Sequence, residues 1–180
     1  MSLGQVVAVA AVALVALLGC DRKPIAEGPR ISVRWTGSDS GRVDAPASAE
    51  WCDTLGLLEI RGIKGDTGIE VAIYPKTTPA PGRYPVLRPE VADTSPPAAA
   101  VALRWFAQTS IRGFKADSGA VVLQRSSGGT YSGRLEAFAH SVTDLAKLTV
   151  HGTFRALTPR PARNGCGPRP ARPDTGAGIH

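Results

Sequence analysis

The chain has 180 residues, a length typical of one domain, and its 21 basic and 15 acidic residues give a formal net charge of +6. Hydrophobic residues make up 43% of the chain and charged residues 20%, a composition that excludes wholesale disorder. The chain contains 20 glycines and 15 prolines but only 6% aromatic residues, which argues against a helical bundle and favours short strands joined by many turns.

The first twenty residues form the strongest pattern in the sequence. Residues 3–19 carry no charge and are nearly all valine, alanine and leucine. A helix that crosses a bilayer needs about 20 apolar residues, so this shorter run fits the apolar region of a secretory signal peptide better. The run ends in Leu17-Leu18-Gly19-Cys20, which resembles the lipobox of bacterial lipoproteins.

The lipobox resemblance implies an anchor in the bacterial cell envelope. By that resemblance, residues 1–19 are a signal peptide cleaved between Gly19 and Cys20. The Cys20 thiol carries a diacylglycerol, and the new N-terminus carries a further acyl chain such as palmitate. Two or three acyl chains hold a protein stably in the lipid bilayer. Asp21 resembles the inner-membrane retention signal of some Gram-negative lipoproteins, so the resemblance favours the inner membrane over the outer one.

An uncleaved membrane helix is the alternative to a cleaved signal peptide. Arg22 and Lys23 directly follow the apolar run. The positive-inside rule would then place the main domain in the cytoplasm, as a membrane-anchored basic protein.

Residues 20–29 predict a short tether, and residues 30–157 predict one β domain. Apolar and polar residues alternate in many short runs, as in half-buried strands. We expect strands at residues 31–36, 57–63, 69–74, 83–87, 101–107, 112–116, 120–125, 132–140 and 148–156. These eight or nine short strands, with turn signals every 8 to 15 residues, predict an all-β fold: an antiparallel β-sandwich or a small barrel.

The connections between these strands carry their own signals. Residues 37–50 and 89–97 predict loops, and residues 141–147 are the one place where a short helix is expected. A Gly-Asp pair at 65–66 and Asp117-Ser118-Gly119 predict hairpin turns, because such residues tolerate the positive φ that a tight turn requires.

Residues 158–180 predict a flexible tail rich in proline, arginine and glycine. The pentapeptide Pro-Arg-Pro-Ala-Arg occurs at 159–163 and again at 168–172, and this composition predicts an extended or disordered segment without strands. Near a membrane, each arginine would be attracted to anionic lipid headgroups by about 1 kcal/mol. Nucleic acid is not expected as a partner, because the protein is exported and has few aromatic residues for base stacking.

The cysteine count predicts one disulfide. If Cys20 carries lipid, Cys52 and Cys166 remain in an oxidising compartment, where a bridge between them is the simplest arrangement. In the cytoplasmic alternative both would be free thiols. The bridge would close a loop of about 114 residues, for which chain entropy gives about 4–5 kcal/mol.

No catalytic, cofactor or metal motif is visible in the sequence. His140 and His151 lack the clustered spacing of metal ligands, with only Glu136 or Asp144 near in sequence, so surface histidines are expected. The loop Ser38-Asp39-Ser40-Gly41 with Asp44 could hold calcium but lacks the alternation of an EF-hand, so an ordinary polar loop is expected.

The three tryptophans divide into two classes. Trp35 and Trp105 are in phase with apolar neighbours and are expected in the core. Trp51, which we place in a loop beside Cys52, is the one tryptophan expected to be available for ligand contact.

The sequence as a whole predicts a membrane-anchored envelope lipoprotein that is a binding or structural module and not an enzyme, with an unidentified envelope protein or glycan as partner. The alternative in a different class is an envelope hydrolase whose carboxylate pair is assembled from separate strands, with Glu59, Glu70 and Glu136 as candidate members. A pair in a cleft, with one raised pKa, would favour the hydrolase.

Overall fold

The structure is a computed structural model that describes residues 28–162. The predicted signal peptide, the lipidation site Cys20 and Cys166 lie outside the described residues. The strands are β1 (Arg30–Gly37), β2 (Gly41–Cys52), β3 (Leu57–Lys64), β4 (Thr67–Tyr74), β5 (Gly82–Pro85), β6 (Ala98–Ala107), β7 (Ser110–Arg125), β8 (Tyr131–Ser141), β9 (Lys147–Leu157) and β10 (Arg160–Pro161), and the one described helix is α1 (Pro89–Ala92).

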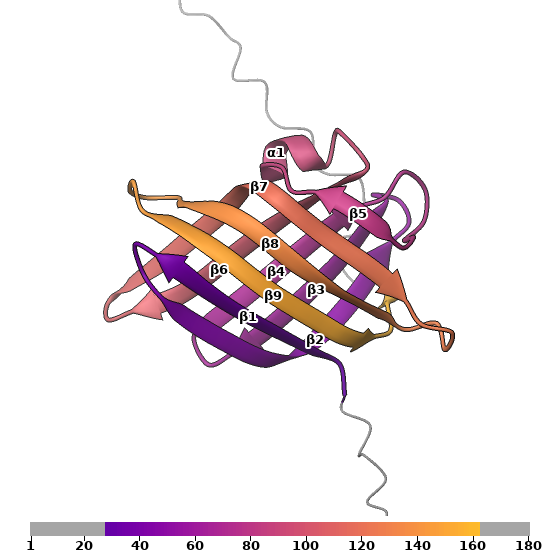
Figure 1. Ribbon diagram of the computed structural model, residues 1–180, viewed down its shortest axis with the longest axis horizontal. Helices are drawn as coiled ribbons and strands as arrows, with labels where there is room; N and C mark the ends of the chain where they lie inside the picture. Colours follow the sequence, from indigo (N-terminus) through magenta and orange to yellow (C-terminus); the bar gives the residue numbers. More distant parts are fainter. Residues whose placement is uncertain (1–27, 163–180) are drawn as a thin grey trace, which may run out of the picture.

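Eight of these strands form a closed antiparallel barrel (Figure 1). Each pairs with the next in the order β1, β2, β3, β4, β6, β7, β8, β9, and β9 pairs back with β1, so the barrel wall has no open edge. β5 pairs with β7, and β10 pairs in parallel with β2. The predicted all-β fold is confirmed, and of the two predicted architectures the barrel is the one observed.

Inward-facing apolar side chains fill the barrel. Along β1, Ile31, Val33 and Trp35 point inward and are buried, while the residues between them face out. Trp35 stacks on Trp105 with ring centroids 5.1 Å apart, and Trp105 stacks on Phe114 at the same separation. The prediction that Trp35 and Trp105 belong to the core is therefore confirmed.

Two inward positions are glycines because large side chains of β1 occupy the space beside them. A Cβ atom on Gly62 would overlap Cγ2 of Ile31, and one on Gly41 would overlap the indole ring of Trp35. The interior of an eight-stranded barrel is just wide enough to be filled by side chains. Large residues on β1 and glycines on neighbouring strands thus share this narrow interior.

The first predicted loop is a strand. β2 covers most of residues 37–50, which the sequence predicted as loop. Its inward side chains are small or medium-sized, such as Val43, Ala45 and Ala49, and its other positions are polar, so the hydrophobic alternation was too weak to recognise.

The predicted hairpin at Asp117-Ser118-Gly119 is also wrong. β7 runs through these residues as one strand, and the register against β8 shifts between Ala116 and Ser118, as at a β-bulge. Gly119 has a φ of 121°. Bulges and tight turns both use residues that tolerate positive φ, so the same sequence signal fits either structure.

Three further expectations need correction. No helix forms at residues 141–147, where β8 ends and β9 begins. The helix α1 lies instead in the predicted loop 89–97. It packs outside the barrel, with Ala92 buried among alanines of β4 and β6. The tail does form a strand at its start, because β10 pairs with β2. β10 pairs with the end of β2 that extends past β1, and as an outer strand it tolerates proline.

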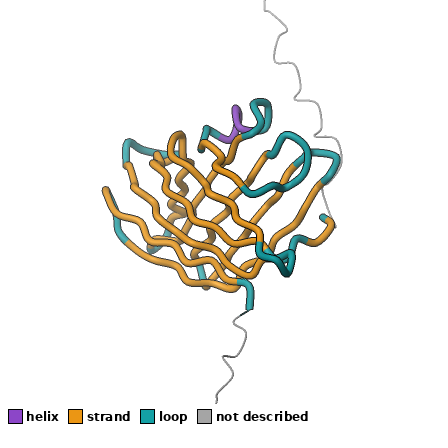
Figure 2. The backbone as a smooth tube through the Cα atoms, turned by 45° about the vertical axis from the view of Figure 1, so that its right-hand side comes forward, coloured by secondary structure: helices purple, strands orange, loops and turns teal. Residues whose placement is uncertain are grey.

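Figure 2 shows that strands make up most of the described chain and that the helix lies at the rim of the barrel. Within residues 28–162, no helix is long and apolar enough to cross a membrane.

Candidate functional site

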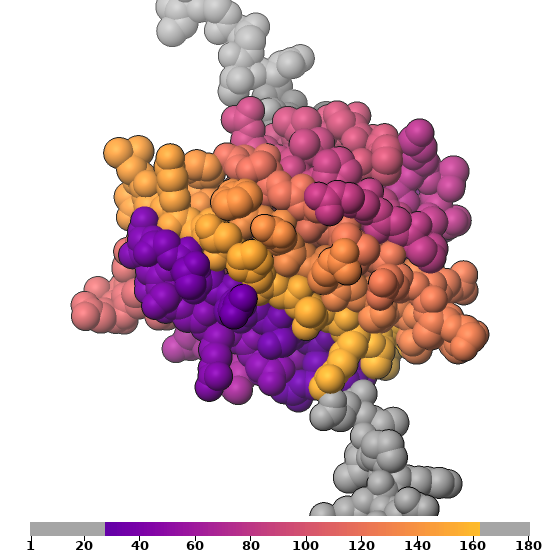
Figure 3. All heavy atoms as spheres, in the orientation of Figure 1, coloured from indigo at the N-terminus to yellow at the C-terminus, as the bar shows by residue number. Residues whose placement is uncertain are grey.

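A groove of about 700 Å³ crosses the outside of the barrel wall that is formed by β1, β9, β8 and β7. This wall faces the viewer in Figures 1 and 3. The charged and aromatic side chains that line it define what we call the arginine groove: Arg34, Arg42, Arg83, Arg134, Glu136, Phe138 and His151.

The strand register explains how residues distant in sequence meet in this groove. In a first row across the wall, Glu136 on β8 lies opposite His151 on β9, and His151 lies opposite Arg34 on β1. Arg34 in turn lies opposite Arg42 on β2. Directly opposite residues of antiparallel strands are close neighbours on one face of the sheet. One row therefore brings together a carboxylate, an imidazole and two guanidinium groups.

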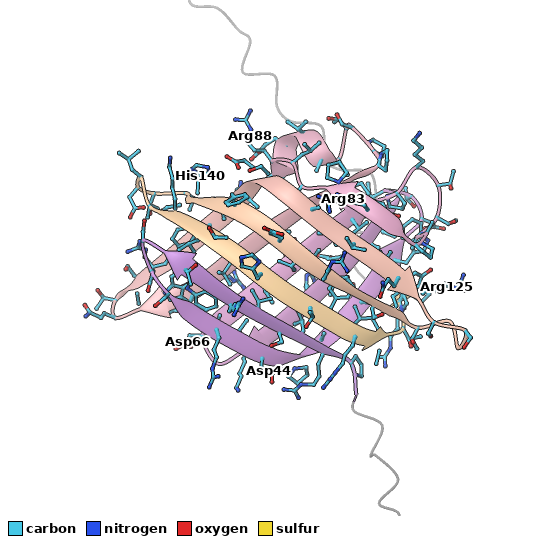
Figure 4. The ribbon with its side chains drawn as sticks, viewed as in Figure 1. Asp44, Asp66, Arg83, Arg88, Arg125 and His140 are labelled. Carbon is cyan, nitrogen blue, oxygen red and sulfur yellow. The ribbon has the colours of Figure 1, made fainter. Side chains whose placement is uncertain are left out.

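A second row lies two residues further along each strand. Arg83 on β5 is opposite Val122 on β7, which is opposite Arg134 on β8. The row continues through Thr153 on β9 to Ser32 on β1. Figure 4 labels Arg83 on β5, at one margin of this wall. β5, although outside the barrel proper, thus extends the groove by one strand and adds an arginine to it.

Small residues leave the groove hollow. Ser32, Ala120 and Thr153 line it between the arginines, and Gly119 and Gly152 contribute backbone without a side chain. The longer side chains therefore project around a shallow floor that carries hydroxyl groups.

The four arginines of the groove have no carboxylate within 4.0 Å among residues 28–162. Arg34 and Arg42 nonetheless lie directly opposite each other, an arrangement that like charges disfavour. Further along the same two strands, Arg30 instead has a diagonal carboxylate partner, because it binds Asp44 at 2.8 Å. The groove therefore holds a net positive charge, four arginines against Glu136, in the form that best binds oxyanions, since a guanidinium forms paired hydrogen bonds with carboxylate or phosphate.

The sequence predicted surface histidines and no metal site, and the structure places the two histidines in different surroundings. His140 lies opposite Lys147 and places Nε2 2.7 Å from Oδ2 of Asp117, whereas His151 lies in the arginine groove. Asp144 is 3.4 Å from Arg112 instead of near either histidine. Across the described part of the chain, no three metal-ligating side chains form a group that could hold a metal ion.

The segment that was considered for calcium, and expected to be an ordinary polar loop, is divided between a turn and a strand. Residues 38–40 form the turn between β1 and β2, where Oδ1 of Asp39 accepts a hydrogen bond from the backbone N–H of Ser40. Asp44 lies in β2, with its carboxylate held by Arg30. The carboxylates of Asp39 and Asp44 therefore both bind groups of the protein itself.

Trp51 and Cys52 lie in β2 and not in the predicted loop. Trp51 is half-buried against the barrel core, and its carbonyl accepts a hydrogen bond from the N–H of Ala162. Its availability for a ligand stays a prediction. Cys52 is buried. Because Cys166 lies outside the described residues, the pairing of Cys52 with Cys166 also stays a prediction.

Two of the three candidate carboxylates are neighbours. Glu59 on β3 and Glu70 on β4 face outward, and Arg61 contacts both, with Nε 3.8 Å from Oε2 of Glu70. Burial raises the pKa of Glu59, and the negative charge of Glu70 raises it further. Glu136 lies on another part of the wall, in the arginine groove. Arg61 thus forms ion pairs with both members of this carboxylate pair. The hydrolase alternative stays a prediction.

The raised pKa of Glu59 predicts a pH-dependent stability. The folded protein holds this proton more tightly than the unfolded chain, so ionisation of Glu59 as pH rises favours unfolding. Glu59→Gln should therefore unfold at a higher urea concentration than the parent protein at about pH 7, and the difference should disappear below about pH 4, where the carboxyl is protonated in both states. Glu70→Gln, at a more exposed position, should gain less. A gain that is equal at both pH values would contradict this account.

Comparison with known proteins adds no relative: no family model, curated protein or solved structure matches the chain. The arginine groove therefore rests on its own geometry. Sequence reasoning singled out Glu136 and His151 for other roles and missed the four arginines. Their shared signal, an outward position on strands that meet in the barrel, becomes visible only once the register is known.

Proposed function

We propose that this protein is a membrane-anchored binding module of the bacterial cell envelope and that the arginine groove binds an anionic ligand. The observation that carries the proposal is the directly opposed pair Arg34 and Arg42, which has no carboxylate partner among the described residues. Keeping two such charges together costs stability, and a bound oxyanion would remove that cost. The groove thus has the character of a binding site and not of a structural ion-pair network.

The anchor is part of the same proposal. The lipobox at Leu17-Leu18-Gly19-Cys20 supports acylation of Cys20, and residues 20–29 would link the acylated cysteine to the start of β1 at Arg30. Asp21 favours the inner membrane. The arginines of the tail would be attracted to anionic headgroups wherever the tail meets the bilayer.

The binding proposal predicts that Arg42→Gln has opposite effects on affinity and stability. Loss of one charge-assisted contact should weaken binding of inorganic pyrophosphate by about tenfold or more, measured by calorimetry on the full chain in non-ionic detergent. Removing the opposed charges should also raise the unfolding free energy of the ligand-free protein by about 0.2–1 kcal/mol.

Arg30→Gln is the matched control, because Arg30 lies on the same pair of strands but is ion-paired with Asp44. It should leave pyrophosphate affinity unchanged and lower stability slightly. The proposal fails if pyrophosphate does not bind, or if Arg42→Gln and Arg30→Gln change affinity equally.

A further inference from the structure

The spacing of the cations across the wall deepens the proposed function, on which this inference rests. Adjacent strands lie about 4.8 Å apart. Two strand steps separate Arg83 from Arg134, and two more separate the strand of Arg134 from that of Arg34. Across the strands, the arginine positions on β5, β8 and β1 are therefore about 10 Å apart, Arg42 lies one strand beyond Arg34, and the wall from β5 to β2 extends about 24 Å. A compact anion reaches only the Arg34 and Arg42 end of this wall, whereas an extended ligand that crosses from the second row to the first reaches all four arginines.

The groups between the arginines are polar and neutral, or acidic. Ser32 and Thr153 supply hydroxyls at the floor, His151 lies beside Arg34, and the exposed carboxylate of Glu136 is present in the same groove. A ligand with densely packed phosphates would meet repulsion at Glu136. A ligand that carries hydroxyl groups between widely spaced acids would find donors and acceptors there.

An aromatic side chain completes the arrangement. Phe138 lines the groove and is 48% exposed, although it belongs to a strand whose other large apolar residues face inward. The apolar face of a sugar ring packs well on an exposed aromatic surface of this kind. The groove volume of about 700 Å³ also lies in the range of small-ligand sites, which runs from about 300 to 1,000 Å³.

We propose that the arginine groove binds an acidic oligosaccharide, a chain of sugar rings bearing widely spaced carboxylate or similar acid groups, which lies across the strands from β5 to β2. The arginines bind the acid groups, the hydroxyls and Glu136 bind the sugar hydroxyls, and Phe138 packs against one ring. A flat anionic membrane does not match a hollow site of this shape, and a uniform polyphosphate does not use Phe138 or Glu136.

The test compares four probes on the full chain in non-ionic detergent: a linear uronate hexamer, the uronate dimer, the hexamer with its carboxylates reduced, and inorganic polyphosphate of the same charge as the hexamer. The intact hexamer should bind at least about tenfold more tightly than the dimer, and the reduced hexamer should not bind. Arg83→Gln should weaken hexamer binding about tenfold and leave pyrophosphate binding unchanged, because a compact anion does not reach β5.

Phe138→Ala separates sugar recognition from general polyanion binding. It should weaken the hexamer severalfold and leave polyphosphate unchanged. Ile111→Ala, which removes another exposed apolar side chain outside the groove, is the control and should change neither. The inference is overturned if polyphosphate or anionic vesicles bind as tightly as the hexamer, or if dimer and hexamer bind equally. Pyrophosphate binding without any oligosaccharide preference would overturn this inference alone, whereas the absence of all anion binding would overturn the proposed function as well.

Discussion

Gly62→Val should lower the unfolding free energy by about 3 kcal/mol, because overfilling a packed core forces neighbouring side chains and backbone to move. The new Cβ would overlap Cγ2 of Ile31, and it would also lie 3.4 Å from Cγ2 of Ile69 and 3.5 Å from Cβ of Ala45. Ile31 is fully buried and has no free space to enter. For a chain of this length, the melting temperature should fall by about 10 °C.

Urea unfolding followed by tryptophan fluorescence measures this loss, since Trp35 and Trp105 lie inside the barrel. Gly128→Val is the matched control, because Ser126 Oγ at 3.8 Å is the one described atom near a Cβ at that turn position. Its effect should be small. If the two valine variants lose the same stability, the barrel interior is not filled as the structure shows.

A second substitution identifies the contact responsible. Ile31→Ala alone should cost about 2–5 kcal/mol through the cavity it leaves. Combined with Gly62→Val it should cost less than the sum of the two, because the valine enters the space that Ile31 vacates. Additive losses would show that the two sites do not share that space.

Strand β1 shows why the sequence predicted individual strands better than the way in which they are arranged. The alternation of Ile31, Val33 and Trp35 identified β1 directly, because the side chains of a strand point alternately inward and outward and so produce a period of two in its sequence. A sandwich and a barrel share that period. The difference lies in the pairing of β1 with both β2 and β9, a contact between the two ends of the domain that no local pattern encodes.

The arginine groove was harder to predict for the same reason. Arg34 and Arg42 are eight residues apart and join a hairpin, but the sequence placed Arg42 in a loop because β2 has a weak hydrophobic pattern. Arg83 and Arg134 reach the groove only through the pairings of β7 with β5 and β8. Their positions depend on the bulge in β7, which the sequence predicted as a turn. Individual outward-facing charges were therefore predictable, whereas their convergence was not.

Removal of the predicted disulfide should have the largest effect on stability. Cys166→Ser should lower the unfolding free energy by about 4–5 kcal/mol, the chain-entropy value for a loop of this size. β10 supplies the structural reason to expect this bridge. It runs parallel to β2, Pro161 pairs with Trp51, and the N–H of Ala162 donates to the carbonyl of Trp51 at 3.0 Å. The chain after β10 thus starts beside Cys52, and the four residues from Ala162 to Cys166 extend up to about 13 Å, enough to fold back onto it.

Cys52→Ser and the double variant should lose the same stability as Cys166→Ser, because either substitution removes the whole bridge.

Intact mass of the protein extracted from membranes provides the independent measurement. Without reductant no cysteine should react with an alkylating agent; after reduction two should react, on a chain that has lost residues 1–19 and gained acyl mass at Cys20. Three reactive thiols on an unprocessed chain would overturn both the bridge and the anchor and would place the barrel in the cytoplasm. If the bridge forms, it also fastens β10 to the end of β2, on the same edge of β2 that pairs with β1 nearer Arg42. The disulfide would hold the end of β2 in place beyond Arg42. Reduction should then weaken anion binding and also lower the free energy of unfolding.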